Sequence, residues 1–216
     1  VSHEAGSLIL PNPNAPTGIA LPVEAILEHA RQHPQRLVVV DEAYVDFGAA
    51  SCLPFINELD NLMVVQTLSK SRALAGLRVG FAFASPDLIE ALERVKNSFN
   101  SYTVDRVAMA GAIAAIEDEA WFEANRAQVM KSRKTLSDAL QNIGFEVLDS
   151  KANFLFVRHR SHDAAKLAQG LRQKNILVRH FAKAGIDQFL RISIGDEDQC
   201  QALILALQIL ISAEAA

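Results

Sequence analysis

Short apolar runs alternate with amphipathic helical patterns along this chain of 216 residues, and the alternation is what most constrains its fold. In the first part of the chain, Pro22 and the Ser85-Pro86 pair predict helix starts, and a further alanine-rich helix is expected to be deeply packed over 104–116. Continuous apolar runs predict strands over 7–10, 37–40, 62–65 and 79–84. Because such strands are typical of sheets covered on both faces, we expect an α/β fold with a mainly parallel sheet.

The pattern changes at Asp118. A long amphipathic helix is expected over about 119–142, and Gly144 follows in a position suited to a left-handed C-cap. Strands are predicted over 145–148, 153–157, 176–179 and 189–194, with helices over 161–174 and from Asp196. We therefore expect two domains, a larger α/β domain over 1–117 and a smaller α+β domain over 118–216.

Composition narrows the classes of partner. The 21 basic and 25 acidic side chains give a net charge of −4, which lacks the positive footprint of a nucleic-acid-binding protein. The apolar run over 202–211 is too short to cross a bilayer, and the start of the chain carries no signal pattern. The two cysteines and six histidines show neither disulfide nor metal-ligand spacing. We expect a cytoplasmic protein with small-molecule substrates, no metal, no nucleic acid and no membrane.

The richest chemical constellation surrounds Lys70, which lies between a predicted strand and a loop. Hydroxyl groups flank it at Thr67, Ser69 and Ser71, and Arg78 follows in the same loop. A lysine in this setting can act as a nucleophile, and a guanidinium with several hydroxyl donors can hold a phosphate. The alternative interpretation is a basic surface loop that follows a strand.

Asp41 comes directly after an apolar strand, at the carboxyl edge where open α/β sheets place their ligands. A carboxylate there can pair with a protonated heterocycle, and Tyr44 can add a phenolic hydrogen bond. A metal-binding acidic pair or a solvated strand end would give the same pattern, so spacing alone leaves these alternatives open.

Two further elements are candidates for ligand contacts. The turn-rich LPNPNAPTG segment places Asn14 where its amide could donate to a ligand, although a plain loop would look similar. Arg179 and Arg191 each lie at or near the end of a late predicted strand, and each could bind a carboxylate or a phosphate with two parallel hydrogen bonds. Taken singly, each arginine could equally be a surface strand residue.

In this order, the motifs N-P-N-x-P-T-G, D-E-A-Y, S-K-S-x-x-L-A-G-L-R-x-G, V-R and L-R-I-S-I-G resemble those of the fold-type I pyridoxal-phosphate (PLP) aminotransferases. The resemblance is closest to the histidinol-phosphate aminotransferases and runs from Leu8 to about Leu210. It implies part of an aspartate aminotransferase-like large domain, followed by the small C-terminal domain. It also implies transfer of an amino group between L-histidinol phosphate and 2-oxoglutarate in histidine biosynthesis, by a homodimer.

The resemblance assigns three catalytic residues. Lys70 is the Schiff-base and proton-transfer residue, Asp41 faces the pyridine nitrogen, and Tyr44 bonds to the phenolic oxygen of PLP. Further cofactor contacts fall to Asn14, Thr67, Ser69 and Arg78. Arg191 matches the arginine that takes the substrate carboxylate, and Arg179 is a second substrate contact, to the substrate phosphate.

The sequence departs from the family pattern at two places. Ala15 stands directly before P-T-G, where relatives carry Asn, so we assign the asparagine contact with the cofactor ring to Asn14. We expect that this chain lacks the N-terminal part of such enzymes. Two other functions therefore stay open: another fold-type I PLP enzyme, such as an aromatic aminotransferase or threonine-phosphate decarboxylase, or a catalytically incomplete fragment that serves as a binding or assembly module.

Overall fold

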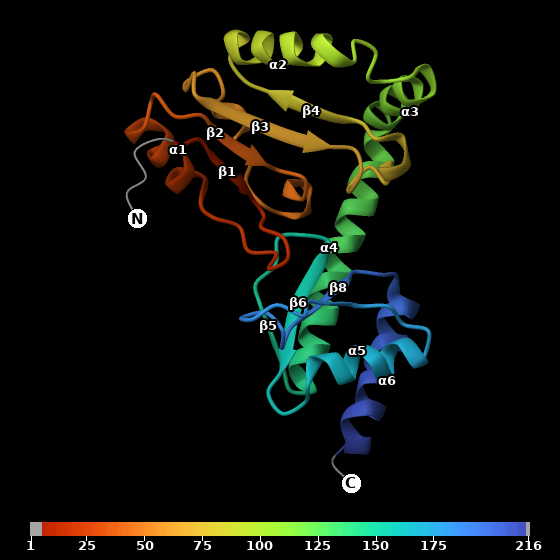
Figure 1. Cartoon of the computed structure of the whole chain (residues 1–216). Coiled ribbons are helices and arrows are strands. Elements are labelled where there is room, and N and C mark those ends of the chain that lie inside the picture. The colour runs from red at the N-terminus through yellow and green to blue at the C-terminus, as the bar shows by residue number, and fades with distance from the viewer. Residues whose placement is uncertain (1–5, 215–216) are drawn as a thin grey trace. The chain divides into compact units, whose positions relative to one another are not determined.

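The computed structural model describes residues 6–214, which divide into two compact units (Figure 1). The first unit comprises residues 6–14 and 20–125, and the second comprises residues 15–19 and 126–214. The division falls inside helix α4 (Glu119–Asn142), after Asn125, whereas the sequence placed it at Asp118. A change of composition marks where a helix begins, but the packing partners along that helix decide where one unit gives way to the next.

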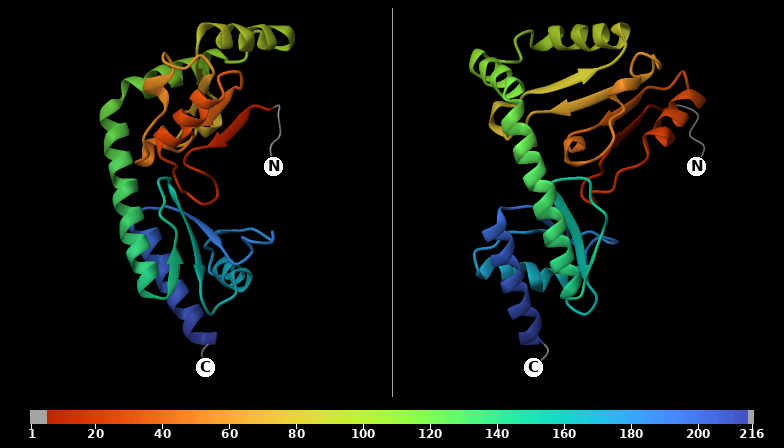
Figure 2. Two further views of the ribbon diagram at one scale, coloured as in Figure 1. Left: turned by 90° about the vertical axis from the view of Figure 1, so that its left-hand side faces the viewer. Right: turned by 180° about the vertical axis from the view of Figure 1, so that it is seen from behind.

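A mainly parallel sheet forms the centre of the first unit, as the sequence predicts (Figure 2). The strands lie in the order β1 (Leu8–Pro11), β2 (Val38–Asp41), β3 (Leu62–Thr67) and β4 (Gly80–Phe83). The first three run parallel, and β4 runs antiparallel to β3. The apolar runs of the sequence thus become neighbouring strands, and β3 extends two residues further than the prediction, to Thr67.

Helix α1 (Val23–Gln32) covers this sheet with one apolar stripe. Its buried residues recur at helical spacing and join the core formed by β2 and β3; they are Val23, Ile26, Leu27 and Ala30.

Helix α2 (Pro86–Phe99) begins as predicted, with Pro86 in its first turn. The Ser85 hydroxyl does not cap this helix but donates to the Asp60 carbonyl at 3.1 Å. Short 3-10 turns, η1 (Val45–Phe47), η2 (Leu53–Phe55) and η3 (Ala75–Leu77), connect the other elements.

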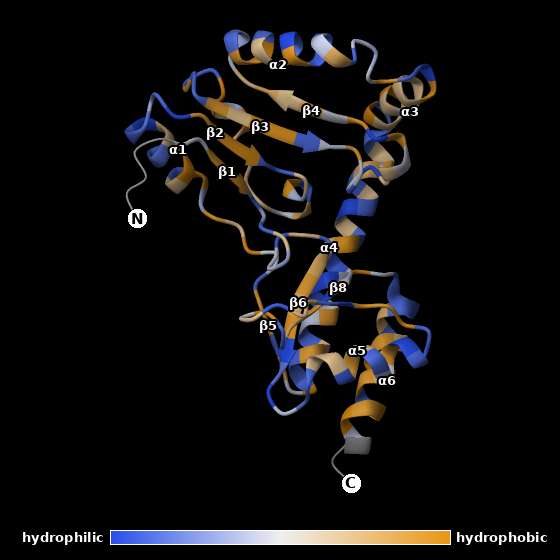
Figure 3. Ribbon diagram, viewed as in Figure 1, coloured by the Kyte–Doolittle hydropathy of each residue, from blue (hydrophilic) through white to orange (hydrophobic). Residues whose placement is uncertain are grey.

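Helix α3 (Arg106–Glu117) contradicts the expectation of deep packing over 104–116. The Asp105 carboxylate caps it by accepting the Ala108 N–H at 2.8 Å. Its buried residues are Ala108 and Ala112, whereas Val107 is 74% exposed. Met109 and Ile113 are each 50% exposed, so the apolar residues of this helix, which is coloured largely as apolar in Figure 3, are not confined to its packed side. Composition alone therefore overestimated the packing of this helix.

The second unit is an antiparallel sheet with helices, which confirms the predicted α+β class. Its strands lie in the order β5 (Phe145–Val147), β6 (Phe154–His159), β8 (Leu190–Ser193) and β7 (Arg179–His180). The remaining elements are α5 (Ala164–Gln173) and α6 (Glu197–Glu214). The strand predicted over 176–179 is wrong in extent, because ladder pairing with β8 begins only at Arg179. Gly144 has φ +92°, the left-handed conformation expected after α4.

Alternating residues of β6 and β8 divide the second unit into a core face and an opposite face. The core residues of the two strands are Leu155, Val157, Leu190 and Ile192, and they pack with residues of α4, α5 and α6. Leu207 of α6 is completely buried in this core. No helix among residues 6–214 is long and apolar enough to cross a membrane.

A buried carboxylate ties the loops of the first unit together. Glu42 follows Asp41 at the end of β2 and is 1% exposed. Its carboxylate accepts hydrogen bonds from the Cys52 N–H at 2.6 Å, the Ser51 hydroxyl at 2.6 Å and the Gln66 amide at 2.9 Å. Burial, together with the nearby Glu42 charge, raises the pKa of the Cys52 thiol to about 12, so this thiol stays protonated at neutral pH.

The core of the second unit generates a stability prediction. Leu207→Ala leaves a cavity in a fully buried site and should lower the free energy of unfolding by about 2–5 kcal/mol. Leu205→Ala on the same helix is the matched control, since Leu205 is 50% exposed and its loss should cost below about 0.5 kcal/mol. Urea denaturation followed by circular dichroism measures both. Equal losses for the two variants would contradict this placement of α6.

The Glu42 network generates a second prediction. Glu42→Ala leaves three donors in or near the core without their acceptor, and should cost about 3 kcal/mol or more of unfolding free energy. Glu58→Ala is the control, because Glu58 is exposed and its contact with Arg31 is a loose surface ion pair of 3.9 Å. Chemical denaturation compares the variants, and a Glu42→Ala protein as stable as the control would show that the network contributes little.

Candidate active site

The topology of the first unit gathers polar residues at one edge of its sheet. Because β1, β2 and β3 are parallel, their carboxyl ends meet at this edge, and antiparallel β4 begins there. The register pairs Pro11 with Asp41 and Thr67 with Gly80, and the Asn12 N–H donates to the Asp41 carbonyl at 2.8 Å. The edge therefore carries the segments that hold the predicted cofactor residues Asn14, Asp41, Tyr44, Thr67, Ser69, Lys70 and Arg78.

Lys70 and Tyr44 lie next to one another at this edge, although they are far apart in sequence. The Lys70 ammonium is 5.2 Å from the centre of the Tyr44 ring, within the range of a cation–π contact. Asp41 is the last residue of β2 and is exposed, and its Oδ1 accepts the Ala43 N–H at 3.0 Å. An amine, a phenol and a carboxylate thus lie at the same edge of the sheet.

The loop after β3 is held in shape by its own hydroxyl groups. The Thr67 hydroxyl lies 2.9 Å from Ser69 Oγ and accepts the Ser69 N–H at 3.1 Å. Ser71 is buried and donates to the Asp46 carboxylate. Arg78 ends the loop with φ +56°, a conformation that costs energy for a residue with a side chain and that is common at functional sites. The exposed Arg78 guanidinium donates to the Ala75 carbonyl at 2.9 Å.

Arg72 is a residue of this loop that sequence reasoning missed. Its guanidinium donates to the Ala115 carbonyl at 2.6 Å, pairs with Glu119 at 3.0 Å and lies 3.7 Å from the centre of the Phe122 ring. These contacts anchor the Lys70 loop to the end of α3 and the start of α4. The motif spacing held no signal for this anchor, because its partners are more than 40 positions away.

The asparagines of the LPNPNAPTG segment have different roles. Asn12 is 1% exposed, and its side chain accepts the Leu21 N–H at 2.7 Å and donates to the Leu21 carbonyl at 3.2 Å. Asn12 therefore closes the base of the loop and is committed to structure. Asn14 is only partly buried, two residues beyond this clamp, and Ala15 is exposed.

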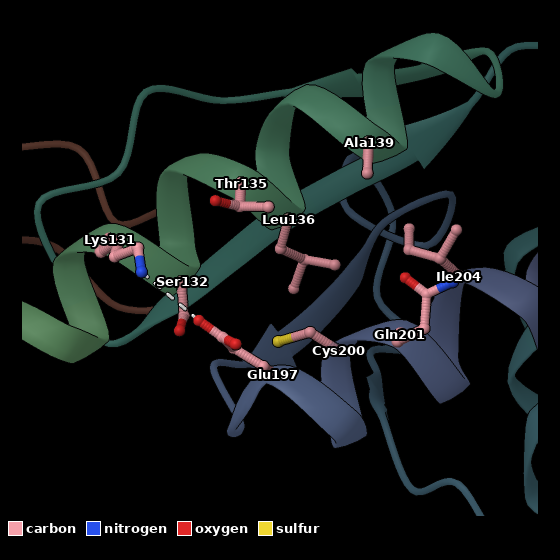
Figure 4. Close-up of a pocket in the computed structure, with 9 residues that line it drawn as sticks. All are labelled: Lys131, Ser132, Thr135, Leu136, Ala139, Glu197, Cys200, Gln201 and Ile204. Atoms are coloured by element: carbon pink, nitrogen blue, oxygen red, sulfur yellow. Dashed lines mark hydrogen bonds and ion pairs between the residues drawn. The ribbon is translucent and has the colours of Figure 1, made fainter.

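The two predicted substrate arginines lie together in the second unit. Arg179 of β7 and Arg191 of β8 are direct partners in the antiparallel ladder, so their side chains leave the same face of the sheet. A separate cavity of about 330 Å³ lies between α4 and α6 of this unit (Figure 4). It is lined by Leu136, Cys200 and Ile204, with the Lys131–Glu197 ion pair at 3.4 Å, and by none of the predicted site residues.

The chain is similar to known aminotransferases along most of its length. It is 59% identical over 207 residues to histidinol-phosphate aminotransferase 1 of Bradyrhizobium diazoefficiens, covering 96% of this chain and 59% of that relative. The chain thus spans just under three fifths of the length of this curated relative.

Solved structures are similar in fold. Histidinol-phosphate aminotransferase from Sinorhizobium meliloti in complex with pyridoxal-5'-phosphate matches with a TM-score of 0.85 at 27% identity, over 97% of this chain and 58% of that one. L-threonine-O-3-phosphate decarboxylase from Porphyromonas gingivalis matches with a TM-score of 0.80 at 26% identity, over 96% and 65% of the two chains. The family model "Aminotransferase class I and II" matches residues 2–207. The chain therefore belongs to the class I and II aminotransferase family.

Proposed function

We propose that this chain provides the lysine-bearing half-site and the small domain of a PLP-dependent aminotransferase that acts on L-histidinol phosphate and 2-oxoglutarate. The observation that carries the proposal is that Lys70 lies beside Tyr44 at the sheet edge where β2 ends with Asp41. The name of the relative that is 59% identical supports the choice of L-histidinol phosphate. The homodimeric state and the cytoplasmic location belong to the same proposal and rest on the family resemblance.

The donor set at the edge suits PLP. The cofactor needs an amine for its aldehyde, an anion for its protonated ring nitrogen, and donors for its phosphate. The first unit offers Lys70, Asp41 and Arg78 for these three purposes, with further hydroxyl groups at Thr67 and Ser69. When bound, PLP supplies an electrophilic aldehyde and a ring that accepts the electron pair released from the substrate carbon.

Each residue at this edge would have its own role in binding the cofactor or moving a proton. Lys70 Nζ would hold the cofactor through its aldehyde, would be released when the substrate amine takes its place, and would then move the proton to and from the substrate carbon. The Asp41 carboxylate would stabilise the protonated ring nitrogen, and the Tyr44 hydroxyl would donate a hydrogen bond to the phenolic oxygen. Arg78, Thr67 and Ser69 would bind the phosphate, and the Asn14 amide would contact the ring.

Arg191 and Arg179 of the second unit bind the anionic groups of the substrates. A guanidinium matches the geometry of a carboxylate or a phosphate, so Arg191 takes the carboxylate of 2-oxoglutarate and Arg179 the phosphate of L-histidinol phosphate. Because Lys70, Asp41 and Arg78 would serve any enzyme of this family, only these arginines bear on the substrate.

The threonine-phosphate decarboxylase alternative is favoured by one fold relative, at a TM-score of 0.80. Both activities use a substrate with an amine and a phosphate, but only the decarboxylase releases carbon dioxide. Incubation with L-threonine O-3-phosphate and with L-histidinol phosphate separates them. We expect amino transfer from L-histidinol phosphate, and carbon dioxide release would support the alternative.

The cofactor proposal predicts a covalent adduct at Lys70. Addition of PLP to the purified chain should give a new absorption band, and borohydride should fix the cofactor on the peptide that contains Lys70, as read by mass spectrometry. Lys70→Ala should abolish both signals and leave the circular dichroism spectrum unchanged. Lys134→Ala is the matched control, since Lys134 is exposed and pairs with Asp138 at 2.8 Å. A folded chain without adduct would instead support the incomplete-fragment alternative.

The substrate proposal predicts a role for Arg191 in binding. Arg191→Ala should weaken 2-oxoglutarate binding by about 2–4 kcal/mol, because a charge-assisted contact with two hydrogen bonds is lost. Isothermal titration calorimetry on the PLP-loaded chain measures the change. Arg160→Ala serves as the control, since Arg160 is exposed and pairs with Glu146 at 3.0 Å. Unchanged affinity in Arg191→Ala would remove Arg191 from the substrate site.

A further inference from the structure

The sheet face of the second unit that points away from its helical core is aromatic and basic. Along β6 and β8 the core residues alternate with residues of this opposite face. On β6 these are Phe154 and Phe156, and Phe156 pairs directly with Arg191 of β8. Arg179 of β7 pairs with Arg191 on its other side, so both guanidinium groups stand beside aromatic side chains.

Two like charges on directly opposed strand residues repel each other. Within the part of the chain that the structure describes, neither Arg179 nor Arg191 pairs with a carboxylate. Two other arginines of this unit, Arg158 and Arg160, both pair with the Glu146 carboxylate. Both guanidinium groups of Arg179 and Arg191 therefore keep their hydrogen-bond donors available for an anionic ligand. The repulsion between the two positive charges must then be offset by another contact.

Phe181 makes contact with both charges. Its ring centre lies 5.5 Å from the Arg179 guanidinium and 5.9 Å from that of Arg191. The negative face of an aromatic ring attracts cations at such distances without occupying their hydrogen-bond donors. The Phe181 ring can thus hold two cations close together and still leave them free to bind an anion.

The Phe181 ring is itself held in place by other aromatic side chains. It meets Phe156 edge-on, with ring centres 6.1 Å apart, and Phe156 is 1% exposed. Phe156 in turn stacks on Phe189 at 4.6 Å with an interplanar angle of 9°. Because edge-to-face and stacked contacts both favour defined ring orientations, the position of Phe181 is set from the sheet below it.

We propose that Phe181 is a positioning residue that holds the Arg179 and Arg191 guanidinium groups together as one receptor for a phosphate monoester. The inference rests on the proposed function in assigning both arginines to substrate anions, and adds the residue that aligns them. A phosphate dianion offers enough oxygen acceptors for two guanidinium forks. If the two guanidinium groups are already aligned before the ligand arrives, binding loses less conformational entropy. A fixed ring can provide this alignment, whereas a flexible aliphatic side chain cannot.

The test uses inorganic phosphate and the cofactor-free chain of 216 residues. Titration is followed by NMR on the Nε–H signals of Arg179 and Arg191, identified with Arg→Lys variants, so that phosphate bound at the Arg78 loop does not contribute. We expect Phe181→Leu to weaken phosphate binding at these signals by about threefold to tenfold. Phe181→Tyr keeps the ring face and should restore binding to within about twofold of the original chain.

Phe99→Leu is the control, because it removes an exposed ring of α2 in the first unit that contacts neither Phe181 nor the Arg179 and Arg191 guanidinium groups. It should leave phosphate affinity within about twofold. The proposal is overturned if the signals do not respond to phosphate, if Phe181→Leu binds as tightly as the original chain, or if Phe181→Tyr binds as weakly as Phe181→Leu. A failed PLP adduct at Lys70, with phosphate binding intact, would overturn the proposed function alone.

Discussion

Parallel pairing of β1, β2 and β3 is the constraint on which the candidate active site depends. Three parallel strands deliver their carboxyl ends to one edge, and antiparallel β4 returns the chain to the same edge. Asp41 at the end of β2 and the loop after β3, which carries Lys70 and Arg78, thereby lie at the same edge of the sheet. A shift of one residue along β2 would turn the side chains of that strand, Asp41 among them, to the other face of the sheet.

Contacts beneath that edge keep the polar loops in position. Glu42 joins the loop at Ser51 and Cys52 to Gln66 of β3 through one buried carboxylate. Arg72 fixes the Lys70 loop from the other side through the Ala115 carbonyl. Loops have little core of their own, so such buried, satisfied polar groups hold the loop that carries Lys70 in a defined place.

In the second unit, aromatic contacts hold the charged side chains in position. Its helices cover one face of an antiparallel sheet, and the opposite face carries Arg179 and Arg191 among phenylalanine side chains. Carboxylate partners would stabilise these arginines but would also occupy the donors that an anion needs. Aromatic contacts stabilise the same charges and leave the donors accessible, which fits a surface that exchanges small anionic ligands.

The sequence by itself determined the α/β and α+β classes, most strands, the helix starts at Pro22 and Pro86, and the order of motifs that places Asp41 and Lys70 at strand ends. These features depend on neighbours in the chain, on apolar periodicity and on turn residues, which a sequence displays directly. Only the tertiary structure decided the exposure of α3, the Glu42 network, the Arg72 anchor and the contact of Phe181 with two arginines. Each of these joins residues that are distant in sequence or depends on which face a neighbour covers, and spacing along a single chain does not encode such contacts.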